Sequence, residues 1–219
     1  MPQYGWHVNI DNCIACRACE GACKQEFMLP TGVRRRQVIV HEGASNGKPF
    51  RAHLSMACMH CASPACMTAC PVGRYWKDTA ENEALRTAFG MNANAPTGLV
   101  LMKPSKAQDP VNGVDCIGCK RCMSACPYGA IEFDETNKRA DKCIGCYHRL
   151  FNTSLPEERR KPACVVTCTS LALHFDDLTK IDGGAYGTVQ AKPGIPGKDI
   201  TDPNLTKPSV RFTPQRNIG

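Results

Sequence analysis

Cys116-Ile-Gly-Cys119-Lys-Arg-Cys122-Met-Ser-Ala-Cys126-Pro127 is the stretch from which the rest of this 219-residue chain is interpreted. Its cysteines follow the spacing C-x2-C-x2-C-x3-C-P, which brings three thiolates around one cubane iron–sulfur cluster. The fourth thiolate of such a run ligates a neighbouring cluster where two are present. Gly118 suits such a loop, because backbone without a side chain can approach inorganic sulfur closely. The stretch therefore predicts a cluster-binding loop.

All sixteen cysteines of the chain fall into four groups of related spacing. Groups one and three have gaps of two, two and three residues, group two has gaps of two, four and three, and group four widens the middle gap to seventeen. Because every ligand position holds cysteine, we expect four 4Fe–4S clusters and no 3Fe–4S site. The groups are Cys13, Cys16, Cys19 and Cys23; Cys58, Cys61, Cys66 and Cys70; Cys116, Cys119, Cys122 and Cys126; and Cys143, Cys146, Cys164 and Cys168.

Disulfides and structural zinc are the alternatives to iron–sulfur clusters. A disulfide scaffold is typical of short secreted chains, and neighbouring C-x2-C cysteines rarely have the geometry for pairing. Zinc takes cysteines as two separated pairs, which suits group four but not the tight runs of groups one and three. The spacing favours clusters over both.

The composition and charge agree with a fold that clusters stabilise. Apolar residues make up 42% of the chain, and roughly 35% when the 16 cysteines are left out, a small share for a core of this size. The formal charge is +7, but four clusters of about −2 each bring the holoprotein to about −1. We therefore expect no nucleic-acid partner, and we interpret the excess Lys and Arg as offsetting cluster charge. The run Arg34-Arg35-Arg36 is interpreted as a solvated basic patch or a partner contact.

The sequence shows neither a signal peptide nor a membrane-spanning segment. Its first ten residues lack a basic region followed by an apolar one, and no stretch approaches the roughly 18 apolar residues of a membrane helix. We expect no direct membrane span. The compartment stays open, since a folded cluster protein can be exported with a partner that carries the signal.

A strand, a cluster loop, a short helix and a second strand recur about four times along the chain. This rhythm predicts an α+β fold of two ferredoxin-like modules, each holding two 4Fe–4S clusters. Groups one and four form the outer module (residues 1–55 and 137–176), and groups two and three form the inner module (residues 56–136, with an insertion at 74–115). Residues 177–219 are expected to be an irregular, extended tail that docks on a partner. Single elements are expected as a strand at 4–10, a turn-rich loop at 42–47, a helix at 78–89 and a hairpin at 130–141.

The motifs resemble the four-cluster iron–sulfur (B) subunits of the dimethyl sulfoxide reductase family of molybdopterin oxidoreductases. The resemblance covers residues 4–176 and is most specific in CIGCKRCMSACPYGAIEFDETNKRADKCIGCYHRL and KPACVVTCTSLAL. Similar subunits serve polysulfide, thiosulfate, sulfite, formate and arsenate enzymes. The resemblance therefore implies the role of the chain and leaves its terminal substrate open.

The resemblance also implies which cysteines share a cluster. The order runs from the cluster nearest a catalytic subunit to the one nearest a membrane quinone subunit. The implied ligand sets are Cys13, Cys16, Cys19 and Cys168 (cluster 1); Cys23, Cys143, Cys146 and Cys164 (cluster 2); Cys58, Cys61, Cys66 and Cys126 (cluster 3); and Cys70, Cys116, Cys119 and Cys122 (cluster 4).

The function implied is electron transfer between a molybdopterin (Mo/W-bisPGD) catalytic subunit and a membrane quinone or cytochrome partner in a respiratory oxidoreductase. No Walker or G-x-G-x-x-G motif is present, and nothing in the sequence indicates a substrate site, so we expect no catalytic residue and no enzyme activity of the chain alone. Such a subunit is peripheral and membrane-associated through its partners. A free polyferredoxin, or a cluster subunit of a hydrogenase or formate dehydrogenase complex, remains the alternative.

Overall fold

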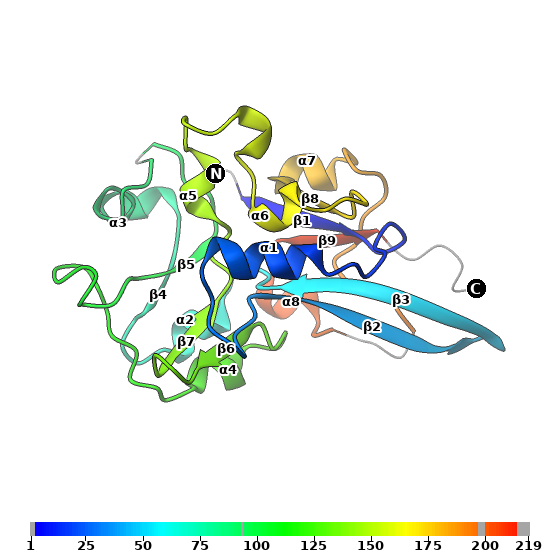
Figure 1. The fold of residues 1–219 in the computed structure, drawn as a ribbon, viewed down its shortest axis with the longest axis horizontal. Helices are drawn as coiled ribbons and strands as arrows, with labels where there is room; N and C mark the ends of the chain where they lie inside the picture. Colours follow the sequence, from blue (N-terminus) through cyan, green and yellow to red (C-terminus); the bar gives the residue numbers. More distant parts are fainter. Residues whose placement is uncertain (1–2, 93, 197–199, 214–219) are drawn as a thin grey trace.

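Strands from opposite ends of the chain meet in the main sheet of the protein (Figure 1). The computed structural model describes residues 3–92, 94–196 and 200–213. In it β1 (Tyr4–Asn9) lies between β8 (Leu173–Asp177), its antiparallel neighbour, and β9 (Val210–Thr213), its parallel neighbour. Trp6 pairs with Phe175 on one side and with Val210 on the other. As the middle strand, β1 buries consecutive residues on both faces, which explains why its sequence is nearly continuous in buried positions.

A long hairpin extends away from the main sheet (Figure 1). It consists of β2 (Arg36–Ser45) and β3 (Lys48–Ala57), which pair antiparallel over their whole length. The loop expected at residues 42–47 is wrong. Strand β2 continues through Ser45, and only Asn46 and Gly47 form the turn. Their φ angles of 49° and 74° are both positive, as a two-residue hairpin turn requires.

Two further two-stranded antiparallel sheets lie within the described part of the chain. The hairpin expected at residues 130–141 is confirmed as β6 (Ile131–Asp134) and β7 (Arg139–Lys142). The other pair, β4 (Tyr75–Lys77) and β5 (Val100–Met102), joins the start of the insertion to its middle. Only three residues long, β4 follows a cysteine turn and was not expected from the sequence.

The helices of the cysteine groups pair across the chain. Helix α1 (Ala18–Glu26) contacts α6 (Ala163–Val166), and α2 (Ala65–Ala69) contacts α4 (Arg121–Ala125). Groups one and four are therefore neighbours, as are groups two and three. Within the described ranges no helix is long and apolar enough to cross a membrane. The remaining helices are η1 (Ala80–Asn82), α3 (Glu83–Ala88), α5 (Tyr147–Leu150), η2 (Glu157–Arg159), α7 (Leu178–Asp182) and α8 (Pro203–Thr206).

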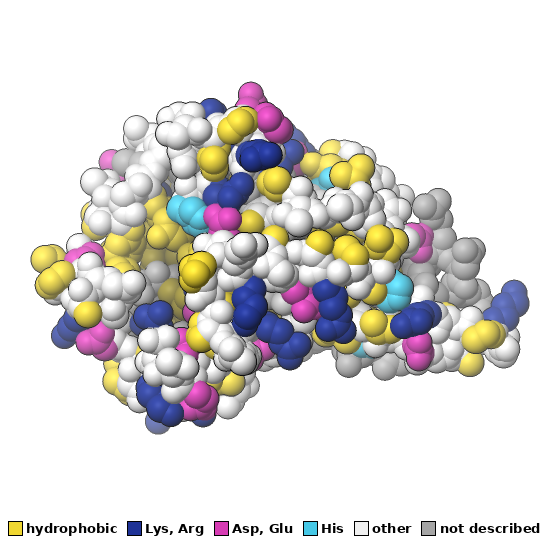
Figure 2. Space-filling view, viewed as in Figure 1, with side chains coloured by type: hydrophobic (Ala, Val, Ile, Leu, Met, Phe, Trp, Pro, Cys, Tyr) yellow, Lys and Arg dark blue, Asp and Glu magenta, His cyan; other side chains and the backbone are white. Residues whose placement is uncertain are grey.

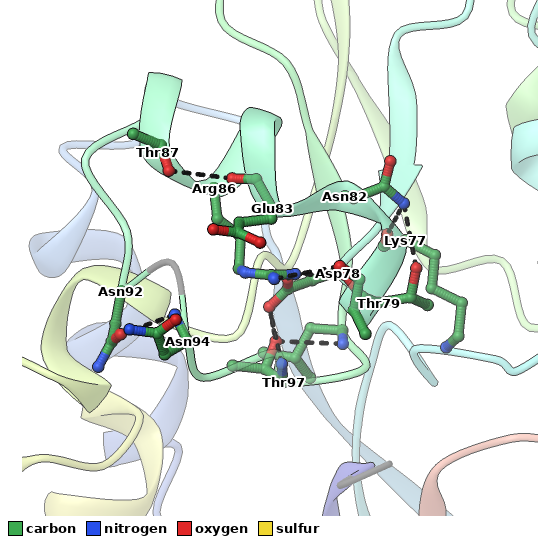
Figure 3. Close-up of polar contacts among 12 residues, drawn as sticks. Lys77, Asp78, Thr79, Asn82, Glu83, Arg86, Thr87, Asn92, Asn94 and Thr97 are labelled. Carbon is green, nitrogen blue, oxygen red and sulfur yellow. Dashed lines mark hydrogen bonds and ion pairs between the residues drawn. The ribbon is translucent and has the colours of Figure 1, made fainter.

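The insertion is held by a buried polar network centred on Asp78 (Figure 3). Arg86 Nη1 lies 3.1 Å from Asp78 Oδ1, and both side chains are almost fully buried. The backbone N–H and the hydroxyl of Thr97 donate to Asp78 Oδ2 at 2.8 and 2.5 Å. Because these contacts close the segment on itself, the helix expected at residues 78–89 is split: a 3₁₀ turn precedes α3.

The tail is more regular than expected from its composition. It contains α7, α8 and β9, and Phe212 in β9 is 0% exposed. Val210 and Phe212 both face the core, with the alternation of a half-buried strand. The tail has too few apolar residues for a core of its own. Its buried side chains pack into the core around β1 instead.

Candidate metal centres

Each C-x-x-C turn bends the backbone in the same way. The residue before the second cysteine has a positive φ in all four groups: Ala15 (55°), His60 (44°), Gly118 (69°) and Gly145 (71°). Glycine adopts this left-handed conformation freely, whereas alanine and histidine adopt it at a cost. Four separate stretches of the chain therefore share a left-handed residue at the same loop position, which turns neighbouring thiols toward a common centre.

A second turn follows the last cysteine of groups two, three and four. Gly73, Gly129 and Leu171 have positive φ, and each donates its N–H to the carbonyl oxygen of the cysteine three residues earlier, at 3.2 Å. The next residue then points its N–H at sulfur: Arg74 N lies 3.4 Å from Cys70 Sγ, and Ala172 N lies 3.3 Å from Cys168 Sγ. Such N–H donors stabilise a thiolate and raise the reduction potential of a cluster bound to it.

At one end of the molecule, Cys13, Cys16 and Cys19 lie near Cys168. Burial raises the pKa of the Cys13 thiol, and the neighbouring thiols of Cys19 and Cys168 raise it further. Cys16 is exposed, and Cys19 Sγ lies 3.5 Å from Ser55 Oγ. We call these four residues thiol set one.

Thiol set two, Cys23, Cys143, Cys146 and Cys164, is entirely buried. Burial raises the pKa of the Cys23 thiol to about 12, and Cys143 and Cys164 add to that rise. Burial likewise raises the pKa of Cys146, and the thiols of Cys143, Cys164 and Cys23 contribute. The backbone N–H of Gly145 lies 3.4 Å from Cys143 Sγ. This set combines one cysteine of group one with three cysteines of group four.

Thiol set three surrounds a cavity. Cys58, Cys61 and Cys66 come from group two and Cys126 from group three, and all four line the same space. Burial raises the pKa of Cys66 to about 12, with Cys58, Cys126 and Cys61 among the groups that raise it. The cavity is otherwise lined by Met59, Pro64, Ala65, Val100, Pro127, Tyr128, Ile131, Lys142 and Thr206.

Thiol set four lies at the other end, where Cys122 neighbours Cys70 and Cys116. Burial raises the pKa of the Cys122 thiol, and the charges of Cys70 and Cys116 raise it further. The hydroxyl of Tyr75 donates to Cys122 Sγ at 3.2 Å. Cys119, in the same loop, is exposed. The sequence analysis did not single out Tyr75, because the contact joins residues 47 positions apart.

The spacing of the thiols distinguishes among the candidate sites. All sixteen cysteines are free, so no disulfide scaffold holds the described residues together. Across those residues, no three Cys, His, Asp or Glu side chains are close enough to hold a single metal ion. A cube of four irons needs ligands that stand further apart than those of one zinc ion. The four thiols around one cavity fit the wider ligand spacing of a cluster.

The basic run, interpreted from the sequence as a solvated patch or a partner contact, is divided among three environments. Arg34 is exposed, as expected. Arg35 is paired with Asp141, with Nε–Oδ1 at 2.5 Å. Arg36 is only 4% exposed and donates to Ser55 Oγ at 3.0 Å. The expectation was wrong for the last two residues, because β2 begins at Arg36 and turns that side chain inward.

Comparison with protein families places these cysteines within known domains. The family model described as a 4Fe-4S dicluster domain matches residues 49–178, and that of a 4Fe-4S binding domain matches residues 10–28. The B chain of the anaerobic dimethyl sulfoxide reductase of Haemophilus influenzae is 33% identical over 214 residues, which cover 94% of this protein and 88% of that relative. The B chain of the Escherichia coli K12 enzyme with the same name is 32% identical, with 97% and 92% covered. The B subunit of the sulfite dehydrogenase of Allochromatium vinosum is 28% identical, with 99% and 85% covered.

Proposed function

Since this protein belongs to the 4Fe-4S dicluster family together with the anaerobic dimethyl sulfoxide reductase B chains, it is an iron–sulfur electron-transfer subunit, and we propose that it carries four 4Fe–4S clusters in a row. The observation that supports this most directly is the cavity of thiol set three, whose ligands come from two different groups. When bound, such clusters accept and release single electrons. The residues of the chain hold them, exclude water from them and tune their potentials.

We assign one cluster to each thiol set. Sets one and four each contain one exposed cysteine, Cys16 or Cys119, whereas all cysteines of set two are buried. Burial raises the pKa of the Cys143 thiol, and Cys58 of set three and Cys164 of its own set raise it further. Sets two and three are therefore neighbours. The proposed order is one, two, three, four, with an exposed loop at each end.

We further propose that the chain forms two modules of two clusters each. The contacts of α1 with α6 support an outer module at residues 1–55 and 137–176, and those of α2 with α4 support an inner one at 56–136. Within the inner module, the β4–β5 pair closes the first part of the insertion at 74–115, and Arg74 Nη1 donates to the carbonyl oxygen of Val114 near its end, at 3.0 Å.

The two exposed ends of the row are the proposed contacts with partners. Ile14 and Ile117 occupy the same position in loops one and three, and each is 62% exposed beside an exposed cysteine. Apolar surface next to a terminal cluster suits a protein partner that must exclude water and bring its own redox centre close. We propose a molybdopterin catalytic subunit at the Cys16 end and a membrane quinone or cytochrome subunit at the Cys119 end. The chain alone is then non-catalytic, and it is peripheral to the membrane through its partner.

A basic face continues the surface at the Cys16 end. Figure 2 shows Lys and Arg side chains gathered between α1 and the β2–β3 hairpin. The groove beside α1 is lined by Arg17, Lys24 and Arg34, by Arg35 in its ion pair with Asp141, and by Glu20 as its acidic member. This charge favours an acidic surface on the catalytic partner, with which the tail is also proposed to make contact.

Anaerobic purification of the tagged chain from its own host tests the proposal. We expect a large partner containing molybdenum or tungsten to co-purify, and roughly sixteen irons per copy of this chain. Dithionite should bleach the cluster absorbance of the isolated chain without any turnover of sulfoxide or oxyanion. Recovery of a partner-free chain with sixteen irons would instead indicate a free polyferredoxin, and zinc in place of iron would contradict the cluster assignment.

A further inference from the structure

Three buried cations of this chain have no carboxylate partner among the described residues. Arg36, Arg74 and Lys142 are 4%, 5% and 0% exposed, and none forms an ion pair there. Elsewhere the chain pairs its buried charge, as in the contact of Arg86 with Asp78. A buried charge without a counter-charge strongly destabilises a fold. The side chains of Arg36 and Lys142 lie beside cysteine thiols, so the counter-charge of these two must come from what the thiols bind.

Lys142 lies between thiol sets two and three. It lines the cavity of set three, and the next residue in the chain is Cys143 of set two. Its ammonium group donates to the carbonyl oxygen of Val100 and, at 2.8 Å, to that of Cys143. Burial raises the pKa of Cys66 and Cys126, and the charge of Lys142 opposes that rise at both thiols. No other lysine of the described residues is 0% exposed.

Arg36 takes the corresponding place between sets one and two. It donates to Ser55 Oγ at 3.0 Å, and the same hydroxyl lies 3.5 Å from Cys19 Sγ of set one. Burial raises the pKa of Cys23 and Cys143, both of set two, and Arg36 opposes that rise. Its guanidinium group therefore acts on two thiol sets at once, as the ammonium group of Lys142 does.

We propose that Lys142 and Arg36 are internal counter-cations between successive clusters, and that each raises the reduction potentials of the two clusters it separates. The proposal rests on the assignment of one cluster to each thiol set. Reduction adds one negative charge to a centre that is already anionic, and a fixed cation beside it lowers the free energy of that step. Two anionic centres placed close together also repel, and a cation between them offsets the repulsion. Lys142 and Arg36 are thus fixed positive charges that favour electron transfer through the buried middle of the row.

A purely structural role for Lys142 is the competing interpretation. Its hydrogen bond to the carbonyl oxygen of Val100 connects the end of β7 to β5, and a neutral donor can provide this bond equally well. The two roles differ in charge dependence. A structural lysine can be replaced by a neutral donor without moving any potential, whereas a counter-cation cannot.

Redox titration of the holoprotein, followed by electron paramagnetic resonance, separates the two roles. The variants are Lys142→Met, which removes charge and donors, Lys142→Gln, which removes the charge and keeps a donor, and Arg36→Gln. Lys180→Met, at a lysine that is 67% exposed on α7, is the matched control. Signals are assigned beforehand by one Cys→Ser substitution in each thiol set.

We expect both Lys142 variants to shift the midpoint potentials of the set-two and set-three clusters to more negative values. Arg36→Gln should shift those of sets one and two, and Lys180→Met should shift none. Unchanged potentials in Lys142→Gln with all iron retained would overturn the proposal for Lys142, and the same result in Arg36→Gln would overturn it for Arg36. If Lys142→Met fails to assemble clusters, Lys142→Gln and Arg36→Gln still decide. Iron content well below sixteen in the wild-type chain would instead contradict the four-cluster assignment, a result distinguishable from an unmoved potential.

Discussion

Tyr75 donates its hydroxyl hydrogen to Cys122 Sγ across 3.2 Å, from the first residue of β4 to a helix of group three. Both residues are buried, at 4% and 6% exposure, so water does not compete for the sulfur. The contact also explains why so short a strand is kept beside a cysteine turn. Replacing Tyr75 by Phe removes one hydrogen bond and leaves the ring that fills the space.

We expect Tyr75→Phe to lower the potential of the set-four cluster by about 40 mV, since a hydrogen bond of about 1 kcal/mol no longer stabilises the reduced form. Redox titration with magnetic detection measures the shift. Tyr147→Phe is the control, because Tyr147 is partly buried beside Cys146 but no described sulfur accepts from its hydroxyl. Equal shifts in both variants would show that the ring environment, and not the hydrogen bond, sets the potential.

Crossed ligation predicts different targets for two cysteines of one loop. Cys126→Ser should alter the set-three cluster, with its partners Cys58, Cys61 and Cys66, while Cys119→Ser should alter the set-four cluster. Serine is a harder ligand than thiolate, so the affected cluster should change its potential or lose one iron. Two different resonance signals should therefore change. A change in one shared signal would show that group three serves a single cluster.

The insertion should depend on the buried pair of Asp78 and Arg86. Asp78→Asn leaves the guanidinium of Arg86 without its carboxylate, at a cost of about 3 kcal/mol, or roughly a hundredfold more frequent opening. Limited proteolysis within residues 83–98 measures that opening, and Glu83→Gln, on the exposed side of α3, is the control. An unchanged cleavage rate in Asp78→Asn would show that the network does not hold the segment.

The last strand should stabilise the isolated chain as well as any complex. Phe212 is 0% exposed, so Phe212→Ala should destabilise the protein by about 3 to 5 kcal/mol through the cavity it leaves. The temperature at which cluster absorbance is lost reports the effect. Leu205→Ala, at a residue 69% exposed on α8, should leave that temperature unchanged. A tail that served only for docking would give no difference between the two variants.

The sequence predicted what local spacing determines. The cysteine groups and the hairpin between β6 and β7 each depend on a few consecutive residues. The long β2–β3 hairpin was also encoded locally, by Asn46-Gly47, but the small polar residues before it were interpreted as a loop. The positions of Tyr75, Lys142 and β9 depend on contacts between distant segments, and no periodic pattern of the sequence indicates such contacts.

The pairing of α1 with α6 has a consequence for synthesis of the protein. Thiol sets three and four are complete once Cys126 has left the ribosome, so the machinery that inserts iron and sulfur can begin on a growing chain. Sets one and two each wait for Cys168 or Cys164, although Cys13 and Cys23 are made first. Under the proposed assignment, the two clusters whose first ligands are made earliest are therefore completed last.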